Sequence, residues 1–187
     1  MHINKYKIAG KVIEINSLYE RVHELCKNYL SDEKCDFSVT IEAKDIEFEK
    51  LKSEKEDIVE GKTVRHFADD YLEELAVYRK IAVKMLDFNT ILFHGSVIAV
   101  DGQGFLFTAK SGTGKSTHTK LWRQYFGEKA VMINDDKPLI HITENSAVVY
   151  GTPWDGKHRL STNTSVTLKA VCILERDETN HIERITK

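Results

Sequence analysis

The sequence has little cysteine and no spacing typical of metal ligands, which argues against disulfide frameworks and against metal sites. Its three cysteines, Cys26, Cys35 and Cys172, are odd in number and lack CxxC spacing. We therefore expect reduced thiols in a cytoplasmic protein, and neither a disulfide framework nor a cysteine-bound metal. The eight histidines are scattered without an HExxH or other paired spacing, so they predict no histidine metal site.

Long apolar runs and an excess of one charge are also missing. No apolar run approaches the about 20 residues that cross a bilayer, and residues 1–15 lack the apolar core of a signal peptide. The formal net charge is −2 with no basic stripe, which argues against nucleic acid as a partner. A hydrophobic content of 41% and 187 residues are typical of one globular domain with a core, or of one domain with a small appendage.

The most informative stretch covers residues 105–122 and reads FLFTAKSGTGKSTHTKLW. It begins with four residues of β character and ends in a predicted helix over residues 115–125. Between them, residues 109–116 fit the phosphate-binding loop (P-loop) pattern, with alanine in place of the first glycine. Strand, glycine loop and helix in this order are the context that a P-loop requires.

This stretch supplies what a triphosphate needs. A helix N-terminus presents unpaired N–H groups with partial positive charge, and Gly112 and Gly114 let the backbone approach the phosphates without an obstructing Cβ. Lys115 places a charge near the β and γ phosphates, and the Ser116 hydroxyl is the expected Mg²⁺ ligand. The alternative is a glycine-rich turn that ends in Gly-Lys-Ser by chance. The predicted ATP-binding residues are Ser111, Gly112, Thr113, Gly114, Lys115, Ser116 and Thr117.

Two carboxylates follow the next apolar segment, residues 131–134. An acidic residue at the end of a strand near a P-loop is a typical magnesium ligand of a nucleotide site. Of Asp135 and Asp136, one would hold Mg²⁺ and the other would accept a proton from an attacking hydroxyl. The alternative is a simple turn, because Asn-Asp-Asp-Lys-Pro consists of turn residues.

The strand that leads into the glycine loop is predicted to pair with the strand before it. Residues 97–100 and 105–108 are separated by DGQG, four residues with two glycines, which favours a hairpin. Parallel neighbours would need a crossover of about a dozen residues. The sequence thus predicts an α/β fold with a mixed sheet, in which an antiparallel hairpin feeds a P-loop.

The remaining segments predict two units. Residues 1–60 suggest a small α+β unit, and residues 61–187 a P-loop nucleotide-binding kinase-like domain that is shortened at its C-terminus or compact. The first unit would contain a strand or hairpin over 6–15, a helix over 18–30 capped by Ser17, a strand over 37–41 and a charged helix or mobile loop over 45–57. The second would contain an amphipathic helix over 66–86 packed on the following sheet, a hairpin over 139–150, and strands over 166–175 and 181–185.

The loop over residues 151–159 concentrates special residues, which is common in binding loops. Trp154 either caps the core or forms a wall of the site. Lys157 or Arg159 is placed to neutralise charge on a transferred phosphoryl group.

Over about residues 90–160, the order of four features resembles the catalytic domain of HPr kinase/phosphorylase. These features are His94-Gly95-Ser96, the glycine-containing hairpin, the loop at 109–116 and Asp135-Asp136. The same loop type occurs in phosphoenolpyruvate carboxykinases. The resemblance implies a fold of this P-loop type, with His94 near the phosphates, Asp135 serving the metal and Asp136 acting as the base. It also implies a homo-oligomer.

Two functions remain open from the sequence. One is a phosphotransferase that moves the ATP γ-phosphate, with Mg²⁺, to a hydroxyl of a protein serine or a small metabolite; its catalytic residues would be Asp136, Asp135, His94, Lys115 and Arg159. The other is a nucleotide-binding module or ATPase without transfer chemistry, which would partner a modification system. A carboxykinase is disfavoured, because those enzymes are much longer chains and no lysine–histidine metal set precedes the loop.

Overall fold

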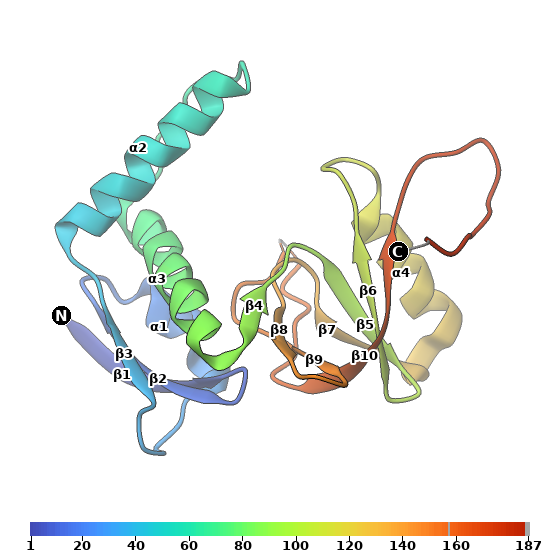
Figure 1. Cartoon of the computed structure of the whole chain (residues 1–187). Helices are drawn as coiled ribbons and strands as arrows, with labels where there is room; N and C mark the ends of the chain where they lie inside the picture. The colour runs from blue at the N-terminus through green and yellow to red at the C-terminus, as the bar shows by residue number, and fades with distance from the viewer. Residues whose placement is uncertain (157, 186–187) are drawn as a thin grey trace.

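Two β-sheets, each with its own helices, organise the chain in the computed structural model, which describes residues 1–156 and 158–185 (Figure 1). The first sheet has the order β1-β2-β3, from β1 (His2–Ile8), β2 (Lys11–Ser17) and β3 (Phe37–Thr40). The second has the order β4-β8-β9-β10-β6-β5-β7 and contains both parallel and antiparallel pairs. The mixed α/β class predicted from the sequence is therefore observed.

The bounds of the remaining elements are as follows. The strands of the second sheet are β4 (Thr90–Leu92), β5 (Ser96–Val100), β6 (Gln103–Thr108), β7 (Ala130–Asn134), β8 (Leu139–Ile142), β9 (Ala147–Tyr150) and β10 (Ser165–Ile173). The helices are α1 (Arg21–Leu25), α2 (Ala43–Val59), α3 (Asp69–Met85) and α4 (Lys115–Phe126), with short 3₁₀ turns η1 (Lys27–Tyr29), η2 (Leu86–Phe88) and η3 (Gly127–Lys129).

The first helix is much shorter than predicted. Residues 18–30 contain α1 with five residues and η1 with three, and Ser17 ends β2 instead of capping a helix. The segment before α1 is instead anchored to α3, where the buried carboxylate of Glu73 accepts hydrogen bonds from the N–H groups of Leu18 and Tyr19 at 2.5 and 2.9 Å. In contrast, α2 confirms the helical alternative for residues 45–57 and begins with a capping box between Glu42 and Asp45.

The amphipathic helix α3 exists as predicted but packs mainly on the first sheet. Its buried face shares one core with β1, β2 and β3, and Leu139 and Trp154 from the second sheet's side complete that core. The expected packing of this helix on the sheet that follows is therefore wrong for most of its length. The division of the chain at residue 60 stays a prediction. The buried face of α3 consists of Leu72, Glu73, Ala76, Val77, Ile81 and Met85.

The second sheet confirms the hairpin that leads into the glycine loop. Strands β5 and β6 pair antiparallel from Ser96↔Phe107 to Val100↔Gln103. The turn between them uses Asp101 and Gly102 with φ of 49° and 75°, the left-handed pair of a tight hairpin. Strand β7 pairs antiparallel with β5, and β10 pairs parallel with β6. The carboxyl ends of β6, β7 and β10 therefore meet the start of β5 at one edge of the sheet.

Helix α4 covers one face of this sheet, where Trp122 and Phe126 pack on β5, β6 and β7 (Figure 1). The hairpin of β8 and β9 and the strand β10 are also confirmed. The strand predicted over residues 181–185 is wrong: the described residues after β10 form no strand. Ile182 and Ile185 are 87% and 72% exposed, so their side chains find no sheet face to cover. No helix among the described residues has the length and apolarity to cross a membrane.

Candidate functional site

The glycine loop (residues 109–116) connects the end of β6 to the start of α4. Gly112 and Gly114 have φ of 79° and 118°, in the region that side chains other than glycine rarely adopt. The N–H of Thr113 donates to the Lys110 carbonyl at 3.2 Å, which closes a tight turn. Gly114 precedes the first helical residue, Lys115, so the loop delivers its backbone directly to a helix N-terminus.

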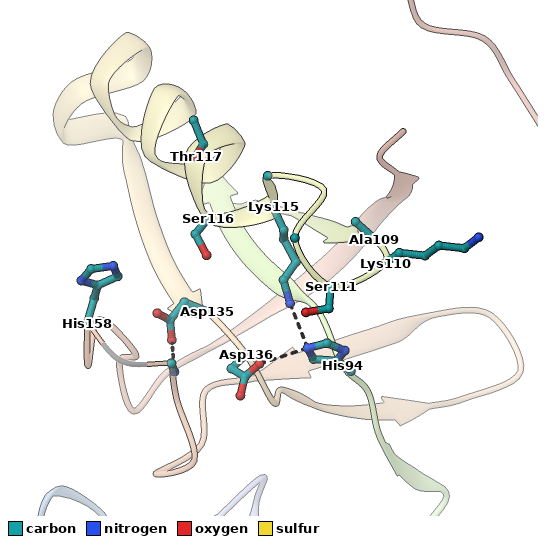
Figure 2. A pocket seen from close by; sticks show the side chains of 13 residues that line it. His94, Ala109, Lys110, Ser111, Lys115, Ser116, Thr117, Asp135, Asp136 and His158 are labelled. Carbon is teal, nitrogen blue, oxygen red and sulfur yellow. Dashed lines mark hydrogen bonds and ion pairs between the residues drawn. The ribbon is translucent and has the colours of Figure 1, made fainter. Parts of the chain in front are cut away.

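A pocket of about 320 Å³ opens in front of this loop (Figure 2). This volume is at the lower end of the range of small-molecule sites, about 300–1,000 Å³. The first N–H groups of the twelve-residue helix α4 have no partner within the helix and carry its positive partial charge. The pocket is lined by His94, Ala109, Lys110, Ser111, Gly112, Gly114, Lys115, Ser116, Thr117, Asp135, Asp136, Gly156 and His158.

Lys115, His94 and Asp136 form a chain of contacts across the pocket (Figure 2). The Lys115 Nζ lies 3.2 Å from His94 Nε2, and the same Nε2 lies 3.2 Å from Asp136 Oδ1. One ring nitrogen serves one of these partners at a time, since it accepts from Lys115 without a proton and donates to Asp136 with one. Burial lowers the pKa of Lys115, and the charges of Asp136 and Asp135 oppose this shift. The lysine is thus partly desolvated, which favours an anionic partner in the pocket.

The two carboxylates lie on a turn that a buried amide holds. Asn134 is fully buried, and its Oδ1 accepts from the N–H groups of Asp136 and Lys137 at 2.9 and 2.7 Å. Its Nδ2 donates to Thr152 Oγ1 at 3.0 Å. The turn and the acidic site, which were alternatives in the sequence, are therefore the same structure: the turn presents the carboxylates to the pocket.

The backbone of the acidic pair is also fixed from the start of β5. The Ser96 hydroxyl donates to the Asp135 carbonyl at 2.8 Å, and the Gly95 N–H donates to the Asp136 carbonyl at 2.9 Å. The His94-Gly95-Ser96 segment thus places both an imidazole and the acidic turn. These contacts follow from the antiparallel pairing of β5 with β7.

The loop after β9 closes the pocket beside Asp135. The Gly156 N–H donates to Asp135 Oδ1 at 2.6 Å, and a Cβ at Gly156 would lie 2.7 Å from Asp135 Oδ2. Burial raises the pKa of the neighbouring Asp155, and the charge of Asp135 adds to this effect. Trp154 is 4% exposed and packs on Tyr78 with ring centroids 5.4 Å apart, which supports its role in the core.

The residues present suit a hydrated Mg²⁺ bound with phosphates. Such an ion takes one or two protein oxygens and completes its shell with water and phosphate. The Ser116 hydroxyl and the Asp135 carboxylate both belong to the lining of the pocket (Figure 2). Among the residues that the structure describes, no group of three or more acidic, histidine or cysteine side chains forms a closed metal cage.

No protein-family model matches the chain, and no curated protein matches it. Among solved structures, the chain is similar to the HPr(Ser) kinase/phosphatase from Coxiella burnetii, with a TM-score of 0.38 and 14% identity. The matched part covers 49% of this chain and 64% of that chain. This likeness is too weak to assign a family.

The predicted site residues are mostly brought together, with two exceptions. Thr113 is absent from the pocket lining. Arg159 is also absent from the pocket lining; it is exposed, has φ of 47° and lies near Asp155. His158 lines the pocket instead. Lys157, the other predicted cation, lies outside the described residues.

Sequence reasoning missed two cations near the site. Arg176, beyond β10, donates through Nη2 to the Gly112 carbonyl at 2.6 Å and through Nε to the Thr113 carbonyl at 3.4 Å. Lys137 places its Nζ 4.0 Å from Asp136 Oδ2. Lys137 adjoins the acidic pair in sequence, which was a usable signal, whereas only the parallel pairing of β10 with β6 reveals Arg176.

Proposed function

We propose that this protein binds Mg·ATP at the glycine loop and transfers the γ-phosphate to a hydroxyl of a protein serine or a small metabolite. One observation carries the proposal: His94 contacts both Lys115 of the glycine loop and Asp136 of the acidic turn, and all three line a pocket sized for a small molecule. Phosphorylation of a hydroxyl needs a base that accepts the hydroxyl proton and a loop that positions the phosphates, and the two walls of this pocket supply one of each.

The loop side would hold the nucleotide. The unpaired N–H groups at the start of α4 and the ammonium of Lys115 would bind the phosphates. The partial burial of Lys115 strengthens its attraction for them, because the surrounding medium screens charge less than water does. Mg²⁺ held by Ser116 and Asp135 would neutralise charge on the β and γ phosphate oxygens.

The acidic side would activate the acceptor. In the transfer, a bond forms between the acceptor oxygen and the γ-phosphorus, and the bond from that phosphorus to the β–γ bridging oxygen breaks. Asp136 takes the proton of the acceptor hydroxyl, a role that contributes about 10²–10⁴-fold in rate. The hydrogen-bonded turn around Asn134 holds this carboxylate in place before the acceptor arrives.

Two variants separate binding from transfer. We expect Lys115→Ala to weaken Mg·ATP affinity at least about tenfold, because it removes a charge-assisted contact worth about 1.5–3 kcal/mol. We expect Asp136→Asn to bind Mg·ATP normally and to lose transfer. Titration calorimetry measures the affinity. Asp32→Asn, a change at an exposed carboxylate, is the matched control.

Phosphorus NMR of Mg·ATP incubated with the protein and a cell extract measures transfer, with the extract alone as a blank. A new phosphoester signal with wild type and not with Asp136→Asn supports the proposal. Binding of Mg·ATP without any new signal would favour the nucleotide-binding module, and free phosphate alone would favour an ATPase. Unchanged affinity in Lys115→Ala would contradict the nucleotide site itself.

A further inference from the structure

The Asp136 carboxylate lies between two basic side chains, one at each oxygen. Its Oδ1 lies 3.2 Å from His94 Nε2, and its Oδ2 lies 4.0 Å from Lys137 Nζ. Rotation of an aspartate carboxylate about its Cβ–Cγ bond would present a different oxygen to the acceptor. Contacts at both oxygens restrict that rotation, and the second contact has no part in the function proposed above.

Lys137 is itself fixed at both ends. Its N–H donates to Asn134 Oδ1 at 2.7 Å, and its carbonyl accepts from Thr152 Oγ1 at 2.8 Å. At the other end, its ammonium lies 4.7 Å from the centroid of the Tyr78 ring. This is within the about 6 Å over which a cation is attracted to an aromatic face. A lysine on a flexible four-carbon stem is therefore held in one direction.

Tyr78 belongs to α3, whose buried apolar side chains form part of the core of the first sheet. Its ring packs on Trp154 with centroids 5.4 Å apart. Burial, with a smaller effect of the Asp136 charge, raises the pKa of Tyr78 well above its usual value, so the ring stays neutral and can attract a cation. The first sheet's helix thus reaches the acidic wall of the pocket.

We infer that Lys137 is a positioning residue for the Asp136 carboxylate and that Tyr78 holds Lys137 in place. This inference rests on the proposed function. It makes α3 a support of the transfer step, although α3 contributes no residue to the pocket lining. Lys137 acts through Asp136 and does not bind the nucleotide.

The test compares variants that keep or remove each contact. Lys137→Met keeps the stem and removes the charge, and Lys137→Arg keeps the charge. Tyr78→Leu removes the ring, and Tyr78→Phe keeps it. The matched control is Lys129→Met, at an exposed lysine that pairs with Asp101 away from the pocket. Initial rates of phosphoester formation in the cell extract are measured over a range of Mg·ATP concentrations, together with Mg·ATP affinity and melting temperature.

We expect Lys137→Met and Tyr78→Leu each to lower kcat about tenfold or more, because displacing a catalytic group by about 1 Å can cost up to about a hundredfold. The KM for Mg·ATP and the affinity of the protein for Mg·ATP should both stay unchanged. Lys137→Arg and Tyr78→Phe should retain most of the rate. The double variant should be little worse than either single variant, since both changes break one arrangement.

The outcomes distinguish this inference from the proposed function. If wild type transfers phosphate but Lys137→Met does so at the full rate, the inference alone is wrong. A loss of Mg·ATP affinity in Lys137→Met would also overturn it, because the lysine would then bind nucleotide. A Tyr78→Leu rate like that of wild type would remove the part assigned to α3. A wild-type protein that forms no phosphoester would overturn the proposed function, and this inference with it.

Discussion

Replacing Asn134 with alanine should damage both the stability of the fold and the acidic wall of the pocket. The side chain is fully buried and makes hydrogen bonds in two directions. Its Oδ1 accepts from two N–H groups, those of Asp136 and Lys137, and its Nδ2 donates to Thr152. Alanine leaves all of these partners in place without their bonds.

The size of the effect follows from these contacts. A lost hydrogen bond costs about 1 kcal/mol, and a group left buried without a partner costs up to about 3 kcal/mol. Because the two N–H groups are only partly buried, we expect the free energy of unfolding to fall by about 2–4 kcal/mol. With a urea slope of about 1–3 kcal/mol per molar, the midpoint should fall by about 0.7–4 M.

Urea denaturation followed by far-ultraviolet circular dichroism measures this change. Asn145→Ala, in the exposed turn between β8 and β9, is the matched control and should change stability by less than about 0.5 kcal/mol. In the folded fraction, Asn134→Ala should lose phosphate transfer more than Mg·ATP affinity, since Asn134 holds the backbone of Asp136 and is not among the residues that line the pocket. A change below about 0.5 kcal/mol in Asn134→Ala itself would refute the role of this amide.

Three further outcomes are expected. Arg176→Ala should weaken Mg·ATP affinity a few-fold in calorimetry, because the guanidinium holds two loop carbonyls, whereas Arg184→Ala should not; equal effects of the two would contradict this. Gly156→Ala should lower the Mg²⁺ dependence of ATP binding by displacing the Asp135 carboxylate, and an unchanged magnesium titration would count against that site. Burial lowers the pKa of His23, so the unfolded chain binds more protons and stability should fall as pH drops below about 6.5; His23→Gln should flatten this dependence in denaturation at pH 5.5 and 7.5.

The glycine loop, the hairpin before it and the helix after it could be predicted from the sequence because they are local. Asp101, Gly102 and Gly112 adopt left-handed backbone, and each turn lies between segments whose apolar residues recur with the period of a strand or a helix. The approach of Asp136 to this loop was also predictable in outline, since it follows a strand of the same sheet. The helix predicted over residues 18–30 is much shorter in the structure, where the N–H groups of Leu18 and Tyr19 bind Glu73. This partner lies more than fifty residues away, so no local pattern reveals it.

The sequence by itself determined the chemistry of the loop and of the acidic turn, because residue type and spacing along a few residues fix backbone conformation and charge. The tertiary structure alone decided which distant side chains support them. Arg176 reaches Gly112 because β10 pairs parallel with β6, and Tyr78 reaches Lys137 because α3 packs on the first sheet yet ends beside the second. Sheet order and helix packing depend on contacts between segments far apart in the chain, which no local pattern encodes.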